Sequence, residues 1–260
     1  MDGEVRFAVE DRVGVITLDR PAALNALRRD MVKSLRDTLT GLDGHADVRA
    51  VMIIGEGRAF CAGVDLNEAE SDVGADDLGI ADGSLEVLQE VTDALRALPV
   101  PTIAALNGLA VGMGSEISIA CDIRIAAKSA YLWFSESKRS LFQSNGVMYL
   151  LPRLIGHSRS IEWMMSARKI RSKELDRSGL VAHVFADEGF RQAALGYASR
   201  IAANSPLSLR LLKEVSRSAF DASLEEVMRL EVEGMKETLR SEYIKEGLRA
   251  FAEKRDPVYD

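Results

Sequence analysis

Apolar and polar residues alternate at the start of the chain. Val5, Phe7 and Val9 fall on one side of a strand pattern, and residues 13–18 form a second strand-like run after the polar residues 10–12. Two such runs joined by a short polar segment predict a β-hairpin.

Helix-like segments and buried strands then alternate. Apolar residues at intervals of about one helical turn predict two amphipathic helices, marked by Met31, Leu35, Leu39 and Leu42 and by Leu85, Leu88, Val91, Leu95 and Leu98. Pro99 and Pro101 end the second helix, because proline lacks a backbone donor and restricts the residue before it. The apolar runs 50–55 and 102–107 predict buried strands, and 117–126 reads as the end of a helix passing into a strand. The repeated order of strand, turn and helix predicts an α/β fold.

The chain becomes helical in character after Phe185. Four helix patterns follow, at residues 190–203, 206–220, 224–239 and 244–254. Ser205 and Pro206 supply a capping residue and a first-turn proline for the second of them. No repeat recurs at a fixed period, so a solenoid is unsupported. Residues 68–84 are acidic and lack periodicity, which predicts a surface loop. A role as a lid is an alternative for this loop.

Composition excludes several classes of protein. The 260 residues, 47% of them hydrophobic, suffice for one large domain or a domain with an appendage. A net charge of -7 and an isoelectric point near 5.2 argue against a nucleic-acid groove, although local cations can still bind small anions.

Cellular location is read from the apolar runs and the cysteines. No apolar run reaches the roughly 20 residues of a membrane helix, and the first residues lack a leader pattern. Cys61 and Cys121 are too few for a disulfide framework and are interpreted as small buried hydrophobes. We therefore expect a cytoplasmic protein with no membrane partner.

Two glycine-rich turns carry the candidate chemistry. They are Gly57-Arg-Ala-Phe-Cys-Ala-Gly-Val-Asp65 and Asn107-Gly-Leu-Ala-Val-Gly-Met-Gly-Ser-Glu116. Each follows an apolar strand pattern and leads toward a helix pattern. Together such turns can aim two backbone N–H groups at one developing negative oxygen, which is the arrangement of an oxyanion hole.

Other sites built on glycine turns fit less well. A phosphate-binding loop requires a lysine that neither turn supplies, and a dinucleotide fingerprint requires a glycine where Ile117 stands. No nucleophile-elbow pattern closes around Ser115. Tight turns without a ligand remain the alternative, and the nearby Glu116 and Glu136 weigh against it.

Six motifs in order resemble the enoyl-CoA hydratase/isomerase, or crotonase, family. They are Pro21-x3-Asn-Ala-Leu27 and the segments 57–66, 105–114, 121–126, 151–156 and 246–255. Each motif is weak alone, and the set covers nearly the whole chain. The resemblance implies a crotonase-like ββα spiral over residues 1–200 that binds acyl-CoA. It also implies a C-terminal helical region over residues 201–260 that assembles homotrimers, often paired into homohexamers.

The same resemblance implies a catalytic apparatus. The backbone N–H groups of Val64 and Met113 would form the oxyanion hole. Glu116 would orient and activate water, and Glu136 would donate a proton to Cα, which is acid–base chemistry suited to a carboxylate pair. The implied reaction is the reversible syn addition of water to a trans-2-enoyl-CoA, giving a 3-hydroxyacyl-CoA. The alternatives are an enoyl-CoA Δ3-Δ2 isomerase and a non-catalytic acyl-CoA-binding member.

This chain departs from the family pattern at the turn and around the second glutamate. Met113 stands where most relatives have glycine, which implies a narrower wall or a shifted turn. Serines at positions 135, 137 and 140 replace a proline, an apolar residue and a glycine. Lys138 and Arg139 are expected to be solvated; the alternative is that they pair with Glu136 and lower its pKa.

Residues for the coenzyme A part of the substrate also follow from the resemblance. Within the chain they are Ala26, Arg28, Ala62, Val64, Asp65 and Leu66, with Asp65 holding the turn. Phe251 and Lys254 match positions that reach a neighbouring subunit's coenzyme A. No separate cofactor is implied, and His45, His157 and His183 lack the spacing of metal ligands.

Overall fold

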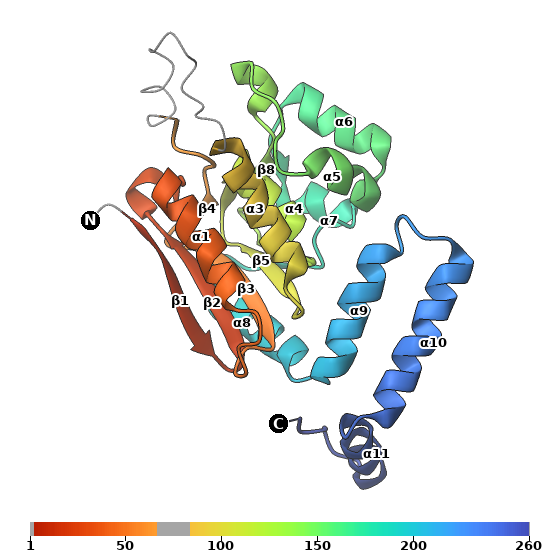
Figure 1. The fold of residues 1–260 in the computed structure, drawn as a ribbon. Coiled ribbons are helices and arrows are strands. Elements are labelled where there is room, and N and C mark those ends of the chain that lie inside the picture. Colours follow the sequence, from red (N-terminus) through yellow and green to blue (C-terminus); the bar gives the residue numbers. More distant parts are fainter. Residues whose placement is uncertain (1–2, 67–83, 260) are drawn as a thin grey trace.

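The computed structural model describes residues 3–66 and 84–259, in which the strands form two sheets (Figure 1). The larger has the order β1-β2-β3-β5-β7-β10, with strands at Glu4–Glu10, Val13–Asp19, Ala50–Gly55, Thr102–Leu106, Ile123–Ala127 and His183–Phe185. Only β1 and β2 are antiparallel among these neighbours, as the hairpin pattern predicts. All six residues of β3 are buried, which fits a central strand covered on both faces.

The smaller sheet has the order β4-β6-β8-β9. Its strands lie at Ala59–Cys61, Leu109–Val111, Tyr131–Trp133 and Ile170–Arg171, and β9 runs antiparallel to β8. Three pairs of consecutive strands, β3-β4, β5-β6 and β7-β8, are divided between the sheets. In each pair the first strand lies in the larger sheet and the second in the smaller one. These strand pairs, separated by helices, form the ββα spiral that the resemblance implies.

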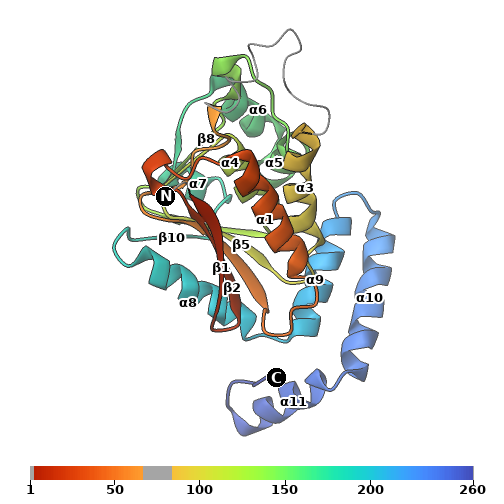
Figure 2. The same cartoon turned by 60° about the vertical axis from the view of Figure 1, so that its left-hand side comes forward.

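Helices cover both sides of the large sheet. On one side α1 (Arg29–Gly41) packs against α3 (Ser84–Ala97), and on the other α8 (Phe190–Ala202) packs on β2, β3 and β5 (Figure 2). The interior contains the short α4 (Met113–Ala120), every residue of which is buried. The remaining helices of this part are the 3-10 turns η1 (Pro21–Ala23) and η2 (Glu136–Arg139) and the helices α5 (Val147–Ile155), α6 (His157–Ser166) and α7 (Ser172–Arg177).

Three C-terminal helices extend away from the sheets. They are α9 (Pro206–Ser218), α10 (Leu224–Arg240) and α11 (Tyr243–Glu253), with α11 at the far end in both views (Figures 1 and 2). Lys213 anchors α9 to the core, because its buried Nζ lies 2.8 Å from Asp122 Oδ2 and donates to two backbone carbonyls. Large apolar side chains remain exposed along α10 at Leu224, Met228, Val232, Met235 and Leu239.

The predicted elements and the observed ones agree wherever the sequence pattern is long. The helices marked by apolar periodicity, the two buried strands and the Ser205 cap are confirmed. The short strands β4, β6, β8 and β9 and the helices α5 to α7 were not individually predicted. The loop expected over residues 68–84 lies outside the described residues up to position 83, and Ser84 begins α3. Within the described chain, no helix has both the length and the apolarity to cross a membrane.

Candidate active site

The two glycine turns lie against each other. A Cβ atom built on Gly63 would lie 3.6 Å from Met113 N and 2.8 Å from Val111 O, and one built on Gly114 would lie 2.3 Å from Cys61 O. Real Cβ contacts are not this short, so the close approach requires glycine at these positions. Gly63 also has a φ of +94°, a conformation that residues with side chains rarely adopt.

Each turn presents a backbone N–H group without an internal acceptor. The segment around Val64 pairs with Leu27 through Gly63 O and Asp65 N, which leaves the Val64 N–H outside the bridge. Met113 is the first residue of α4, and the first N–H groups of a helix have no intrahelical partner. Within residues 3–66 and 84–259, neither N–H has a hydrogen-bond acceptor.

The side chain of Met113 is buried. It is 4% exposed and packs with the hydrophobic core, as do the apolar residues that follow it in α4. The methionine that replaces the family's usual glycine is therefore accommodated inside the protein.

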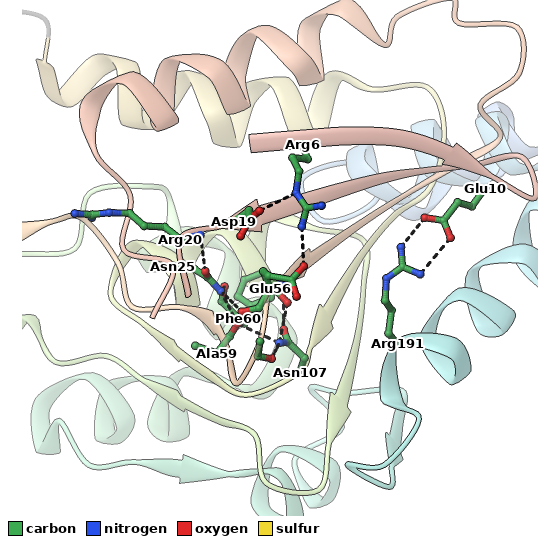
Figure 3. A network of polar contacts seen from close by, with 12 residues as sticks. Arg6, Glu10, Asp19, Arg20, Asn25, Glu56, Ala59, Phe60, Asn107 and Arg191 are labelled. Atoms are coloured by element: carbon green, nitrogen blue, oxygen red, sulfur yellow. Dashed lines mark hydrogen bonds and ion pairs between the residues drawn. The ribbon is translucent and has the colours of Figure 1, made fainter. Parts of the chain in front are cut away.

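Asn25, which is buried, and Asn107, which is partly buried, fix the strand end that leads into the first turn (Figure 3). Asn25 Nδ2 donates to Ala59 O at 2.8 Å and to Glu56 O at 2.9 Å. Asn107 Nδ2 donates to the carbonyls of residues 55 and 57, both at 2.9 Å, and Asn107 Oδ1 accepts from the N–H of residue 55. These bonds join three segments that are distant in sequence. They fix the position of the backbone that leads into residues 61–64.

An ion pair holds the other end of this turn. Arg20 Nη1 lies 2.6 Å from Asp65 Oδ2 and also donates to Ala26 O at 3.2 Å, while Asp65 N donates to Leu27 O. Asp65 is nearly buried. Asp65 therefore restrains the turn in two ways, with its carboxylate paired to Arg20 and its backbone N–H bonded to Leu27 O.

Glu116 lies in the first turn of α4 and is 2% exposed. Its Oε1 accepts from Ser144 N at 3.1 Å, and its Oε2 accepts from Asn145 Nδ2 at 2.5 Å. Burial raises the pKa of this carboxyl, the two hydrogen bonds oppose the rise, and the charge of Glu136 adds to it. The group is thus held in place while remaining easier to protonate than an exposed glutamate.

Glu136 begins η2 and is 8% exposed. Its Oε2 accepts from Gln143 Nε2 at 2.8 Å, and its Oε1 lies 3.2 Å from the position that a Cβ on Gly112 would occupy. Burial raises its pKa, against the opposing effects of its own backbone N–H, Gln143 and Arg139. Both carboxyls therefore belong to one site beside the second glycine turn.

The altered loop keeps its basic residues away from the carboxyl. Lys138 and Arg139 are exposed, and their charged groups lie 5.8 and 5.5 Å from the ring centre of Trp133. Neither forms an ion pair with a carboxylate in the described chain. The structure therefore shows no ion pair between these residues and Glu136; the charge of Arg139 still acts to lower the pKa of Glu136, but burial outweighs it.

Two functional candidates were missed in the sequence. Gln143 and Asn145 each donate to one of the glutamates, although both lie in the loop where the family pattern favours glycine and proline. The available signal in the sequence is the pair of amide residues, Gln143 and Asn145, directly before Gly146 and the apolar residues of α5. Such residues are costly to bury unless they have partners.

The structure brings some of the proposed coenzyme A residues together. Ala62 N donates to Leu24 O at 3.0 Å, so Ala26 and Ala62 lie on neighbouring segments beside Val64. Arg28 instead binds Asp30 through Nε and Nη2 and donates to Gly3 O. Leu66, the last described residue before the gap, is half-exposed.

Phe251 and Lys254 lie far from this site in the single chain. Both are at the C-terminal end of α11, which is remote from α4 in both views (Figures 1 and 2). Phe251 is 85% exposed. Any contact with coenzyme A would therefore have to be made to another subunit. The part of the chain that the structure describes also contains no group of three or more side chains placed to hold a metal ion.

Comparisons with known proteins agree with this fold. The sequence model of the family described as "Enoyl-CoA hydratase/isomerase" matches residues 8–260. Human mitochondrial methylglutaconyl-CoA hydratase is 33% identical over 267 residues, covering 98% of this chain and 76% of that protein.

Solved structures give the same assignment. An enoyl-CoA hydratase from Bacillus anthracis superposes with a TM-score of 0.91 at 33% identity, covering 100% of this chain and 99% of that one. An enoyl-CoA hydratase from Polaromonas sp. JS666 superposes with a TM-score of 0.93 at 29% identity, covering 99% of this chain and 100% of that one. Since the family model matches nearly the whole chain and these relatives cover it almost completely, this chain belongs to the enoyl-CoA hydratase/isomerase family and has the crotonase fold.

Proposed function

We propose that this protein is an enoyl-CoA hydratase that catalyses the reversible syn addition of water to a trans-2-enoyl-CoA, giving a 3-hydroxyacyl-CoA. The observation that carries the proposal is the pair of buried carboxyls, Glu116 and Glu136, beside a turn with an unpartnered N–H. Hydration needs one group that takes a proton from water and another that supplies one to carbon. Two acidic groups in one dry site meet that need.

The two free N–H groups would bind the thioester oxygen. As water adds at Cβ, negative charge develops on this oxygen through the conjugated system. Donors from Val64 and Met113 that are already in place would stabilise that charge, on the order of 3 kcal/mol for each donor. The absence of an acceptor for either group within the described residues supports this role.

The glutamates would divide the proton transfers between them. Glu116, ionised, would accept a proton from the water whose oxygen bonds to Cβ, and Glu136, protonated, would give its proton to Cα. Burial raises the pKa of both groups, and the charge of Glu136 raises that of Glu116 further. One proton shared between two neighbouring carboxyls is the expected state of such a pair.

Coenzyme A enters this proposal as part of the substrate, with no separate cofactor. Ala26, Ala62 and Leu66 would border the thioester arm beside Val64 and Asp65. For Arg28 to bind a phosphate of coenzyme A, its guanidinium would have to exchange Asp30 for the ligand. Any contribution of Phe251 and Lys254 would come from a neighbouring subunit.

The exposed face of α10 supports assembly into homotrimers, which can pair into homohexamers. Leu224, Met228, Val232, Met235 and Leu239 are spaced three or four residues apart, so they share one side of the helix, and each is more than half exposed. Such a stripe on a soluble protein favours a subunit interface. Light scattering should give three or six chains for the wild type and a smaller species for Val232→Lys, while an unchanged mass for the variant would remove α10 from the interface.

Double-bond isomerisation is the second candidate. Both oxygens of Glu116 accept hydrogen bonds from other residues, whereas Glu136 accepts a side-chain hydrogen bond at Oε2, and its Oε1 faces the position of a Gly112 Cβ. A single carboxylate suits a proton shuttle between two carbons. A purely binding function is less well supported, because the altered loop leaves Glu136 in the site.

The test is the loss of conjugated enoyl-thioester absorbance over a series of trans-2-enoyl-CoA chain lengths. A hydratase should act on these substrates, and both Glu116→Gln and Glu136→Gln should lose roughly 10²- to 10⁴-fold in kcat. A 3-enoyl-CoA series tests isomerisation, for which Glu116→Gln should retain much more activity than Glu136→Gln. Folded wild type that binds the thioesters and converts neither series would contradict both catalytic proposals.

A further inference from the structure

A basic hollow lies outside the proposed acyl-CoA site. Its volume is about 520 Å³, and it is formed by α6, the start of β9 and α7. The lining residues are five cations, one carboxylate and a serine, namely Arg159, Lys169, Arg171, Lys173, Arg177, Glu174 and Ser178. None of them contributes to the glycine turns or contacts either catalytic glutamate.

The carboxylates near this hollow are already engaged by a different arginine. Arg168 donates to both oxygens of Glu174, at 2.6 and 2.7 Å, and to both oxygens of Glu162, at 2.8 and 2.9 Å. The pKa of each glutamate is lowered by this arginine, so both remain ionised and paired with it. In the described chain, none of the five lining cations has a carboxylate partner.

The cations converge from separate elements. Lys173 and Arg177 are four residues apart on α7 and share one face of the helix, where like charges repel. Arg171 is placed beside Tyr131 by the antiparallel pairing of β9 with β8, and Arg159 comes from α6. Residues 168–177 contain five lysines and arginines, Arg168 among them, although the net charge of the whole chain is -7. An anion that entered the hollow would relieve this repulsion.

One of the lining cations, Lys169, also lies over aromatic rings of β8. Lys169 Nζ lies 4.9 Å from the ring centre of Tyr131 and 5.2 Å from that of Trp133. Lys138 and Arg139 approach Trp133 as well, so three cations surround one indole ring. Cation–π contacts hold the ammonium groups near the surface without neutralising their charge.

We propose that this hollow binds a small polyanion carrying a diphosphate group. Several lysine and arginine donors around one concave site are the chemistry that recognises phosphate oxygens, and guanidinium groups bind them in a bidentate manner. The hollow has the size of a small-molecule pocket, and the acidic surface of the whole chain disfavours nucleic acid. The proposal is independent of the reaction at Glu116 and Glu136.

The test uses inorganic pyrophosphate, inorganic phosphate and acetate as probes with the purified full-length protein at low ionic strength. Isothermal titration calorimetry should show saturable binding that is strongest for pyrophosphate and weakest for acetate, and added salt should weaken it. Trp133 and Trp163 are the only tryptophans of the chain, and Trp133 contacts Lys169. Pyrophosphate should therefore change the tryptophan emission, and Trp133→Phe should abolish that change while calorimetric binding persists.

Charge-reversing variants decide whether the hollow is the site. Lys173→Glu combined with Arg177→Glu should weaken pyrophosphate binding by about tenfold or more, because two unpaired donors become acceptors. Lys245→Glu, an exposed position on α11, is the charge control and should bind as wild type. Circular dichroism melting checks that each variant is folded. Absence of saturable binding, or equal binding by the folded double variant and wild type, would overturn the proposal.

Discussion

The side-chain amide of Asn145 donates to the buried carboxylate of Glu116, with 2.5 Å between Nδ2 and Oε2. Gln143, two residues earlier, makes the corresponding bond to Glu136 at 2.8 Å. One loop thus supplies an amide to each catalytic candidate. Since a donor favours the ionised form of a carboxyl, the loop opposes the effect of burial on both.

Replacing Asn145 with leucine should shift the acid side of the pH–rate profile. Loss of the donor raises the pKa of Glu116 further, so the ionised base appears only at higher pH. A hydrogen bond to a charged group contributes roughly 1.5–3 kcal/mol, which corresponds to a shift of about 1–2 pH units. The measurement is kcat/KM against pH with the best enoyl-CoA substrate.

Gln143→Leu is the matched variant for the other carboxyl. Here the pKa of Glu136 rises, so its protonated form persists to higher pH. The alkaline limb of the pH–rate profile should therefore shift to higher pH. The two substitutions therefore affect opposite limbs of one curve. A uniform loss of rate with an unchanged profile in both would mean that the amides serve only to maintain the loop.

Glu116→Gln should stabilise the folded protein at neutral pH while it removes activity. Burial raises the folded-state pKa of Glu116 above its unfolded value. The free energy of unfolding contributed by such a group is fully present below the unfolded pKa and is lost as pH rises through the folded pKa. The melting temperature of the variant should thus exceed that of wild type near pH 8, with the difference shrinking near pH 4. A lower melting temperature at pH 8 would show that the bonds to the carboxylate outweigh its desolvation.

Asn107→Ala should unfold the strand end that supports the first glycine turn. Its side-chain amide donates to the carbonyls of residues 55, 57 and 59, and all three carbonyls would lose this partly buried donor. We expect about 2–4 kcal/mol less stability in urea unfolding, together with reduced kcat. Asn204→Ala is the control, since that amide bonds only exposed carbonyls at the end of α8. Equal losses in the two variants would contradict the specific role of Asn107.

Gly114→Ala should disrupt the contact between the two turns. The added Cβ would lie 2.3 Å from Cys61 O and 2.8 Å from Cys61 Cβ, so the backbone must shift. Activity should fall by more than about 10²-fold if the N–H groups are displaced by an ångström. Gly196→Ala in α8 meets nothing within 4 Å and should gain up to about 1 kcal/mol from helix propensity. Near-wild-type kinetics for Gly114→Ala would show that the turns need not touch.

The sequence by itself determined the elements whose patterns are long or whose motifs are specific. Met31, Leu35 and Leu39 are buried along α1 as their spacing predicts, and β3 is the apolar run 50–55. Burial along a helix or strand repeats with the period of that element, so such residues report their own local structure. The family motifs likewise singled out Glu116 and Glu136 as candidates, and both lie buried in the structure.

Only the tertiary structure decided which distant groups meet. The three-residue strands β4, β6 and β8 are too short to show a period, and they form a sheet only because the spiral stacks them. Asn145 binds a carboxylate 29 residues away, and Arg168 engages the glutamates that would otherwise neutralise the basic hollow. Such contacts depend on how whole elements pack. No spacing along the chain encodes them, since the partners are brought together by the shape of the core.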